Sequence, residues 1–426
     1  MQVDLIIRGG MCVSHRGIIQ ADIAVRDGMI VAIGDFSDLD AENIIIADGL
    51  HILPGMIDTE FHVSHQFKND TRAAAKGGVT SVLCVAGMDV GVGDGYYTDY
   101  AYFQQATLDN IDSLAELEMA QGCAGIHLGM AETADFSAIA DDRTLLKALK
   151  NGSRRIVIHA EDQDRLNLRK KLIKAGNPSS HLEWHDENVA IEATRRILAI
   201  ARGAGRPVHI QHVSSDKEMA MIAAYKDIAT AAVAPAHLFL SAPECYDHFF
   251  NYTKLDPPIR DEQNRIGLWK ALSGGIVDIL ASAHSPRSIE QKELNYPHCS
   301  SGCPAVQTML PLMLDQVAKG AISLETIADL TSSGPARIFN IAAKGRIAVG
   351  YDADFTIVDL KKKWTFQDDD VESTCGWDLH AGCEFTGQVT NTIIRGHLTF
   401  RDGEIIGEAM GKTIKFHDTF KPFDKE

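Results

Sequence analysis

The middle of the chain alternates two kinds of segment, and this alternation constrains the fold more than any other feature of the sequence. Between about residue 54 and residue 341, short apolar runs alternate with longer segments of helical apolar spacing. Continuous apolar strands that alternate with helices are typical of a parallel sheet covered on both faces. The runs are LPGMIDTEFH (53–62), TSVLCVAG (80–87), SLAELEMA (113–120), AGIHLGM (124–130), RIVIHAED (155–162), PVHIQHVS (207–214), TAAVAPAH (230–237) and VDILASAHS (277–285). Eight runs predict a closed (β/α)8 barrel over residues 54–341.

One helical segment of this region is well marked at its end. The stretch ENVAIEATRRILAIARGAG, residues 187–205, repeats apolar residues at helical spacing and closes on a glycine. An open, doubly wound sheet is the alternative to a barrel. No GxGxxG loop follows the first run, which disfavours that alternative.

Both ends of the chain are rich in predicted strands rather than in helices. The stretch ADIAVRDGMIVAIGD contains Asp27-Gly28, a pair typical of a hairpin turn, and similar stretches return in DADFTIVDL and VTNTIIRGHLTFRDGEIIG. Because each end is too short for an independent sandwich, we expect residues 1–53 and 342–405 to form one composite β-sandwich domain. The last stretch, 406–426, carries aromatic residues and mixed charges, and we expect it to form an exposed arm that packs on a neighbouring subunit.

The net charge and the cysteine pattern limit which binding partners and which cellular compartment we expect for this protein. The formal net charge of −17 repels phosphate backbones and anionic membranes, so we expect no nucleic-acid or membrane partner. The first residues do not read as a signal peptide and no apolar run is long enough for a membrane span, so we expect a cytoplasmic protein. None of the eight cysteines lies in a CxxC pair, which predicts reduced thiols. Cys299 and Cys303 alone are close enough to share a metal or a disulfide, although their CSSGC setting favours a plain loop.

Several predicted strands end in groups that can do chemistry. Glu60 and His62 end the first run and, being two residues apart in a strand, share one face. The histidines of the later runs are His127, His159, His209, His212, His237 and His284. A single histidine is more often a structural core or surface residue than a ligand. Their clustering at the carboxyl ends of barrel strands, where such folds hold their active sites, favours a functional site.

Sequence motifs along most of the chain resemble those of a known family. LPGMIDTEFH, TRAAAKGGVTSV, HAED, HIQHVS, KLDPPIR, SGCPAVQTMLPLM, GPARIF and KGRIAVGYDADFTIVDL occur in this order. The chain resembles the cyclic-amidohydrolase branch of the amidohydrolase superfamily, which contains dihydroorotases, hydantoinases, dihydropyrimidinases and allantoinases. The resemblance runs to about residue 405 and implies a (β/α)8 barrel with a composite β-sandwich.

The metal site that this resemblance implies has changed at three positions. Glu60 stands where the family has the first histidine of its D-x-H-x-H motif, and His127 stands where it has a carboxylated lysine. Ala283 replaces the aspartate that is both ligand and general base. Two cations would repel each other without these anionic ligands, so a binuclear centre is not expected.

The remaining imidazoles still allow one metal ion. His127, His159 and His212 provide the usual number of protein ligands for a catalytic zinc and leave its fourth position to water. An empty site is one alternative, and an arrangement that uses Glu60 and His62 is another. Elsewhere, Asp256 stands where relatives often have asparagine, which replaces a donor–acceptor amide by an acceptor-only carboxylate.

Catalytic and substrate-binding roles can be suggested for the same region. Glu60 is the best candidate to accept a proton from the attacking water, with His284 as the second choice. The structural alternative for Glu60 is an ion pair beneath the barrel. Ser64, His237 and Asp256 align with positions that contact substrate in relatives; Ser64 stands where dihydroorotases carry an arginine, which argues against orotate-type substrates.

Two classes of function remain open from the sequence. The first is a hydrolase that opens a small cyclic amide or imide with zinc-activated water. The second is a catalytically silent homologue that serves as a scaffold or oligomer subunit. The replacement of a lysine by His127 favours the enzyme, since histidine also binds metals, whereas Ala283 favours the silent homologue.

Self-association is expected in either case, as a homodimer or homotetramer. Relatives of this type commonly form such assemblies, and closed symmetric homo-oligomers are common among soluble enzymes. Sedimentation velocity at micromolar concentration should therefore show a species heavier than the 46.5 kDa chain. A single species at the mass of one chain would contradict this prediction.

Overall fold

A computed structural model describes residues 3–85, 95–133 and 135–419 of the chain. Eight parallel strands form a sheet that runs in chain order from β8 to β15. The sheet closes where the His62 N–H donates to the His284 carbonyl at 2.8 Å, beside a parallel bridge between Phe61 and His284. The strands are β8 (Met56–His62), β9 (Val79–Val85), β10 (Asp99–Gln105), β11 (Cys123–Gly129), β12 (Ile156–His159), β13 (Val208–Ile210), β14 (Ala229–Val233) and β15 (Ile279–Leu280). The predicted barrel is confirmed.

One predicted barrel strand is wrong. The run 113–120 contains the short helix α2 (Leu114–Leu117), and the third strand of the barrel is β10, with the sequence DYAYFQQ. This strand does not stand out as an apolar run because it contains polar residues. One of them, Asp99, can be buried because it forms ion pairs with Lys344 and Arg395. Parallel pairing with β9 and β11 defines it instead. The last two residues of the second run, 86–87, lie outside the described residues.

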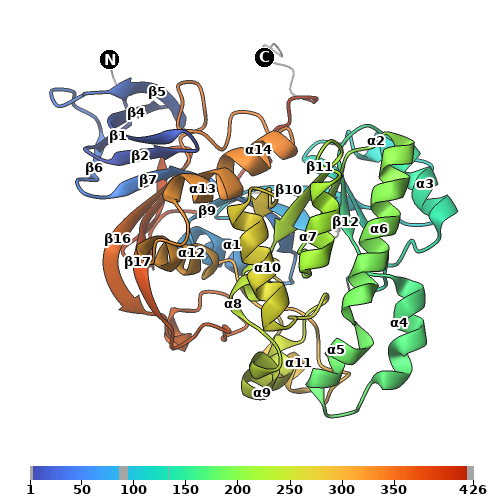
Figure 1. The fold of residues 1–426 in the computed structure, drawn as a ribbon. Helices are drawn as coiled ribbons and strands as arrows, with labels where there is room; N and C mark the ends of the chain where they lie inside the picture. Colours follow the sequence, from blue (N-terminus) through green and yellow to red (C-terminus); the bar gives the residue numbers. More distant parts are fainter. Residues whose placement is uncertain (1–2, 86–94, 134, 420–426) are drawn as a thin grey trace.

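Helices cover the outside of the barrel (Figure 1). The predicted helix 187–205 is α6, which begins after Asp186, whose side chain accepts from the Val189 N–H, and ends at Gly205 in the left-handed conformation, with φ 69°. The helices are α1 (Phe67–Lys76), α3 (Asp142–Lys150), α4 (Gln163–Arg169), α5 (His181–Trp184), α6 (Glu187–Ala204), α7 (Asp216–Ala223), α8 (Pro235–Phe239), α9 (Glu244–Phe249), α10 (Glu262–Ser273), α11 (Ile289–Glu293), α12 (Met309–Ala318), α13 (Leu324–Ala328) and α14 (Gly334–Ile338). None of the helices within the described ranges is long and apolar enough to span a membrane.

The two ends of the chain meet in one β-domain beside the barrel, where the blue and the orange-red strands of Figure 1 lie together. Strand β7 pairs with β2 from its own end and with β16 from the other end of the chain. A seven-stranded sheet runs in the order β19-β18-β17-β16-β7-β2-β3, and a four-stranded sheet in the order β5-β4-β1-β6. The composite sandwich is therefore confirmed, whereas its limits at 1–53 and 342–405 stay a prediction. The strands are β1 (Leu5–Arg8), β2 (Met11–Ser14), β3 (Gly17–Gln20), β4 (Asp22–Arg26), β5 (Met29–Gly34), β6 (Asn43–Ile46), β7 (His51–Pro54), β16 (Phe355–Thr365), β17 (Glu384–Ile394), β18 (His397–Arg401) and β19 (Glu404–Ile405).

Local features of the sequence appear where they were expected. Asp27 and Gly28 join β4 to β5 with positive φ values of 53° and 76°, as a tight hairpin turn requires. The cysteines are free thiols, including Cys299 and Cys303, and only Cys383 is exposed. The CSSGC segment is a loop without a disulfide.

The C-terminal segment differs from the exposed arm that the sequence suggested. Ile414 and Phe416 are buried in the same apolar cluster as Phe103 and Phe339 of the barrel region. The Ile414 N–H donates to the Tyr100 carbonyl at 2.8 Å. The Phe416 ring is buried within its own chain because the barrel interior provides an apolar surface against which it packs. Phe420 and Phe423 of the predicted arm lie outside the described residues.

This packing predicts a structural role for the segment. Replacing Phe416 by Ala removes a ring that is 1% exposed and leaves a cavity, which should lower the free energy of unfolding by about 3–5 kcal/mol. Urea unfolding followed by circular dichroism measures the loss. Leu168→Ala, at a side chain that is 73% exposed, should change stability by less than about 0.5 kcal/mol. Equal midpoints for the two variants would show that the segment does not stabilise the barrel.

Candidate active site

A pocket opens at the carboxyl ends of the barrel strands. Parallel strands of a closed barrel bring their last residues to one rim, which is why side chains from distant parts of the sequence meet here. The loop after β11 contributes Asp135 and Phe136 to its wall. Further lining residues include Glu60, His159, His212, His237, Asp256 and Ala283.

Carboxylates and imidazoles form a series of close contacts that begins at Glu60 on the pocket wall. The Glu60 Oε1 atom lies 3.4 Å from His212 Nε2, and that nitrogen lies 3.1 Å from His159 Nδ1. The other side of the His159 ring lies 3.2 Å from the Glu161 carboxylate, which contacts His185 Nδ1 at 2.9 Å. We call the following set the acid–imidazole row: Glu60, His212, His159, Glu161, His185, Asp256 and His181. Its members follow one another through close contacts, which suits the orientation of protons, and the ligand atoms of the last three, His185, Asp256 and His181, lie within 4.8 Å of one another.

Glu60 is the least satisfied member of the row. Its side chain is 1% exposed, and neither carboxylate oxygen has a hydrogen-bond donor among the described residues. Burial, with a contribution from the nearby Asp58 charge, raises the pKa of Glu60 well above that of an ordinary glutamate. Burial also lowers the pKa of His212 well below its usual value. A buried carboxyl with a raised pKa suits general acid–base catalysis, and the imidazole beside it is neutral.

His127 does not join His159 and His212 at a common point. Its Nδ1 lies 2.9 Å from Gln105 Oε1, and its Nε2 lies 2.9 Å from Gln211 Oε1. Burial lowers the pKa of His127 to about 3, so the ring is neutral and carries one N–H that donates to one of these two glutamine oxygens. His127, His159 and His212 are not among the groups of three ligand atoms within 4.8 Å in the described part of the chain, and a metal site formed by these three imidazoles stays a prediction.

Two other predicted site residues, His62 and Ser64, also contact neighbouring side chains. His62 Nδ1 lies 3.3 Å from Asp135, which also pairs with Arg287. Burial opposes ionisation of Asp135, but its contacts with His62 and Arg287 lower its pKa well below the usual value. Ser64 donates its hydroxyl to Asp70. Neither Ser64 nor Asp70 is among the residues that line the pocket.

His284 also lies outside the pocket lining. Its ring stacks on Phe61 at 4.8 Å between centroids, and its Nδ1 accepts from the Ala305 N–H at 3.2 Å. These contacts hold the ring away from the pocket, so the structure does not bring this second candidate base to the site. His209, in β13, contacts the Thr230 hydroxyl at 2.9 Å.

His237 and Asp256 do line the pocket, as the sequence suggested. The His237 Nε2–H donates to the Pro257 carbonyl at 3.2 Å, and burial lowers the pKa of this histidine to about 4. Although burial opposes ionisation, contacts with His181 and His185 hold the pKa of Asp256 well below its usual range. The site thus offers a neutral imidazole and a carboxylate on its walls.

The sequence analysis missed His181, His185 and Glu161. The two histidines are four residues apart in HLEWH, so they lie on one side of a helical turn, and this spacing was available as a signal. Glu161 follows His159 in HAED and carries no signal of its own. Only the fold shows that it lies between two imidazoles.

The fit of a metal can be judged from the ligand atoms. Among the described residues, the groups of three ligand atoms within 4.8 Å of one another are His181–His185–Asp256 and Asp99–Asp352–Asp354. Lys344 already pairs with the three carboxylates of the second group. The centre of the barrel, with Ala283 and the occupied His127, does not fit the binuclear cluster that the resemblance implies.

Comparisons with known proteins agree with this architecture. The model of the amidohydrolase family matches residues 51–399, and the chain belongs to this family. It is 31% identical to a dihydroorotase of Pyrococcus abyssi, over 97% of this chain and 98% of that protein. An allantoinase of Escherichia coli O1:K1 is 30% identical, over 94% of this chain and 96% of that protein. The structure of an L-hydantoinase from Arthrobacter aurescens matches with a TM-score of 0.91 at 26% identity, over 97% of this chain and 100% of that chain.

These similarities confirm the cyclic-amidohydrolase branch that the sequence motifs suggested. The protein is accordingly an enzyme of the class that hydrolyses C–N bonds in cyclic amides. The described residues also contain a group that could hold a metal ion.

The buried carboxyl of Glu60 predicts a pH-dependent stability. A raised pKa in the folded state means that the contribution of Glu60 to stability is present at low pH and is lost as pH rises through the folded-state pKa. Glu60→Gln keeps the shape and removes the charge, so the thermal stability of the variant relative to wild type should increase as pH rises above about 4.3, the ordinary pKa of a glutamate. Glu408→Gln, at an exposed carboxylate, provides the control and should show no such trend. A Glu60→Gln difference that stays flat over this range would contradict the raised pKa.

Proposed function

We propose that the protein hydrolyses a small cyclic amide or imide in the pocket at the barrel rim, with Glu60 as the general base. The observation that carries this proposal is the buried, unpartnered carboxylate of Glu60 on the pocket wall, 3.4 Å from His212. A general base works best when its pKa lies near the operating pH, and the surroundings of Glu60 raise its pKa in that direction.

The proposed reaction uses the groups of the row. Glu60 accepts one proton from water while the water oxygen forms a bond to the carbonyl carbon of the ring. The C–N bond then breaks, and Glu60 returns the proton to the leaving nitrogen, which gives a carboxylic acid and an amine or amide. His212 Nε2 lies 3.4 Å from the Glu60 carboxylate, and Glu161 fixes His159 by accepting from its Nε2–H. Because the Nδ1 of His159 is then the acceptor, the His212 Nε2–H points at it.

The walls of the pocket favour a substrate ring with N–H groups. Asp256 can only accept hydrogen bonds, as an imide or ureide N–H would require. Arg287 also lines the pocket, but it already pairs with Asp135 at 2.8 Å. A neutral ring therefore fits better than a carboxylated one. The role proposed for Ser64 would need its hydroxyl to leave Asp70.

Zinc at the barrel centre is a finer proposal, and the reaction above does not depend on it. A single ion held by His127, His159 and His212 requires that His127 be released from Gln211. His62 could join such a site only by leaving Asp135. The short distance of 3.1 Å between His159 Nδ1 and His212 Nε2 supports this proposal.

A silent homologue is the alternative, and two observations favour it. Glutamines occupy both nitrogens of His127, and Ala283 stands at the position of the family's general base. A scaffold role needs neither of these groups. We further propose a cytoplasmic homodimer or homotetramer without nucleic-acid or membrane partners, consistent with the formal charge of −17.

The test is the turnover of a substrate panel by Glu60→Gln. The panel contains a hydantoin, allantoin, dihydroorotate, a lactam and a cyclic imide, and ring opening is followed by chromatography. Wild type should open at least one ring, and the variant should be slower by roughly a hundredfold to ten-thousandfold because glutamine cannot accept the proton.

The matched control is Glu218→Gln. Glu218 is a buried glutamate that accepts from the Thr194 hydroxyl and does not line the pocket, so this variant should keep the wild-type rate. Equal rates for wild type and Glu60→Gln would exclude Glu60 as the base. Failure of wild type to open any ring would support the silent homologue.

A further inference from the structure

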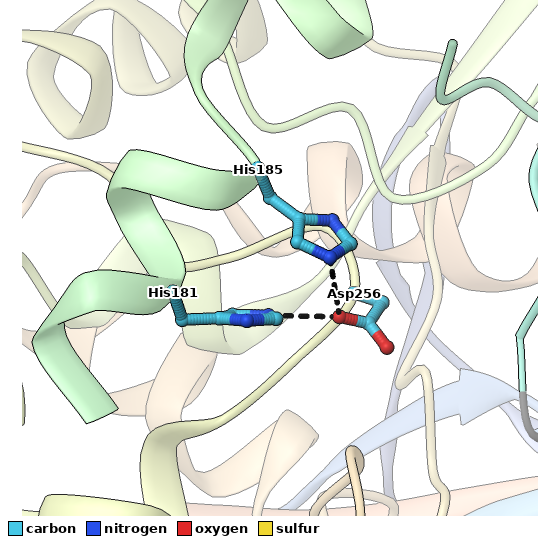
Figure 2. A group of neighbouring side chains, drawn as sticks. All are labelled: His181, His185 and Asp256. Carbon is cyan, nitrogen blue, oxygen red and sulfur yellow. Dashed lines mark hydrogen bonds and ion pairs between the residues drawn. The ribbon is translucent and has the colours of Figure 1, made fainter. Parts of the chain in front are cut away.

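Three ligand-type side chains meet at one end of the acid–imidazole row. His181 belongs to α5 and His185 follows directly after it, whereas Asp256 comes from the loop before α10. Figure 2 shows both rings turned toward the same carboxylate oxygen. The Asp256 Oδ1 atom lies 2.8 Å from His181 Nε2 and 3.8 Å from His185 Nε2. All three ligand atoms lie within 4.8 Å of one another.

Glu161 sets the orientation of the His185 ring. Its Nδ1 donates to Glu161 Oε1 at 2.9 Å, so in the neutral ring the lone pair is on Nε2, which faces Asp256. A carboxylate that accepts from one ring nitrogen and leaves the other free to coordinate is the usual arrangement behind metal-bound histidines. Glu161 is 1% exposed, so this support is rigid and dry.

His181 can present its Nε2 in the same way. This nitrogen now shares its proton between Asp256 and the Leu255 carbonyl, 2.9 Å away. On the other side of the ring, Nδ1 lies 3.4 Å from the Tyr296 hydroxyl. Moving the ring proton to Nδ1 would keep it near an acceptor and free Nε2 for a cation.

We propose that His181, His185 and Asp256 bind one zinc ion at the rim of the pocket. Two imidazoles and one carboxylate are a standard zinc ligand set, and two histidines four residues apart reach one ion from one helical turn. Zinc bonds of about 2.0–2.2 Å in a tetrahedron place the ligand atoms roughly 3.3 Å apart. The present distances of 2.8 and 3.8 Å lie on either side of that value, so shifts of side chains are enough.

The proposed ion would have an open position toward the pocket. His181 and His185 are buried, whereas the Asp256 side chain is 20% exposed and lines the pocket. The fourth position is therefore accessible to water or to a polar atom of a substrate. This inference does not rest on the proposed hydrolase activity, since it is tested by metal binding itself.

The experiment measures zinc in the full-length protein and in single variants. Each protein is treated with a chelator, given zinc sulfate and desalted, and its zinc is measured by mass spectrometry; affinity follows from competition with a fluorescent chelator. Wild type should hold one zinc per chain. His185→Gln and Asp256→Asn should bind at least tenfold more weakly, because each removes a ligand without emptying its space.

Variants at the centre of the barrel separate this site from the predicted central one. His159→Gln and His212→Gln should keep zinc in the proposed rim site, and the exposed His248→Gln controls for the loss of an imidazole. Circular dichroism checks that each variant is folded. The proposal is overturned if wild type binds no zinc, if Asp256→Asn and His185→Gln bind it like wild type, or if only the central variants lose it.

Discussion

The closure of the barrel is the contact on which the rest of the site depends. The His62 N–H donates to the His284 carbonyl and joins the first strand to the segment after the last one. This contact helps to bring Glu60 and Ala283, more than half of the chain apart, to the wall of one pocket. Without it the sheet would stay open, and the ends of its strands would not surround a pocket.

Glu161 organises the polar groups that the closed barrel gathers. It accepts from His159 on one side and from His185 on the other, so one buried carboxylate fixes the tautomers of two rings. Burial opposes ionisation of Glu161, but its contacts with these two imidazoles lower its pKa well below the usual value. Glu60, at the far end, lacks such partners, and its pKa is raised. The different environments therefore give the two glutamates different roles: Glu161 holds two imidazole rings in place, and Glu60 is the candidate base.

Much of the fold was predictable from local pattern. Apolar runs predicted seven of the eight barrel strands, and Asp27-Gly28 predicted a turn, because burial and backbone conformation act on neighbouring residues. Strand β10 was missed because its Asp99 is neutralised by Lys344 and Arg395, more than two hundred residues away in the chain. Phe416 was assigned to an exposed arm for the same reason: its apolar surroundings come from distant segments.

The same distinction between local pattern and distant contacts applies to the candidate active site. The sequence by itself determined which chemical groups end the strands, including Glu60, His159 and His212, and that Ala283 removes a carboxylate. Only the tertiary structure decided that Gln105 and Gln211 occupy His127, and that His181, His185 and Asp256 meet. A hydrogen bond or a metal ligand set depends on distances of a few ångströms between atoms, and sequence separation does not fix those distances. The closed barrel and the loops above it fix them.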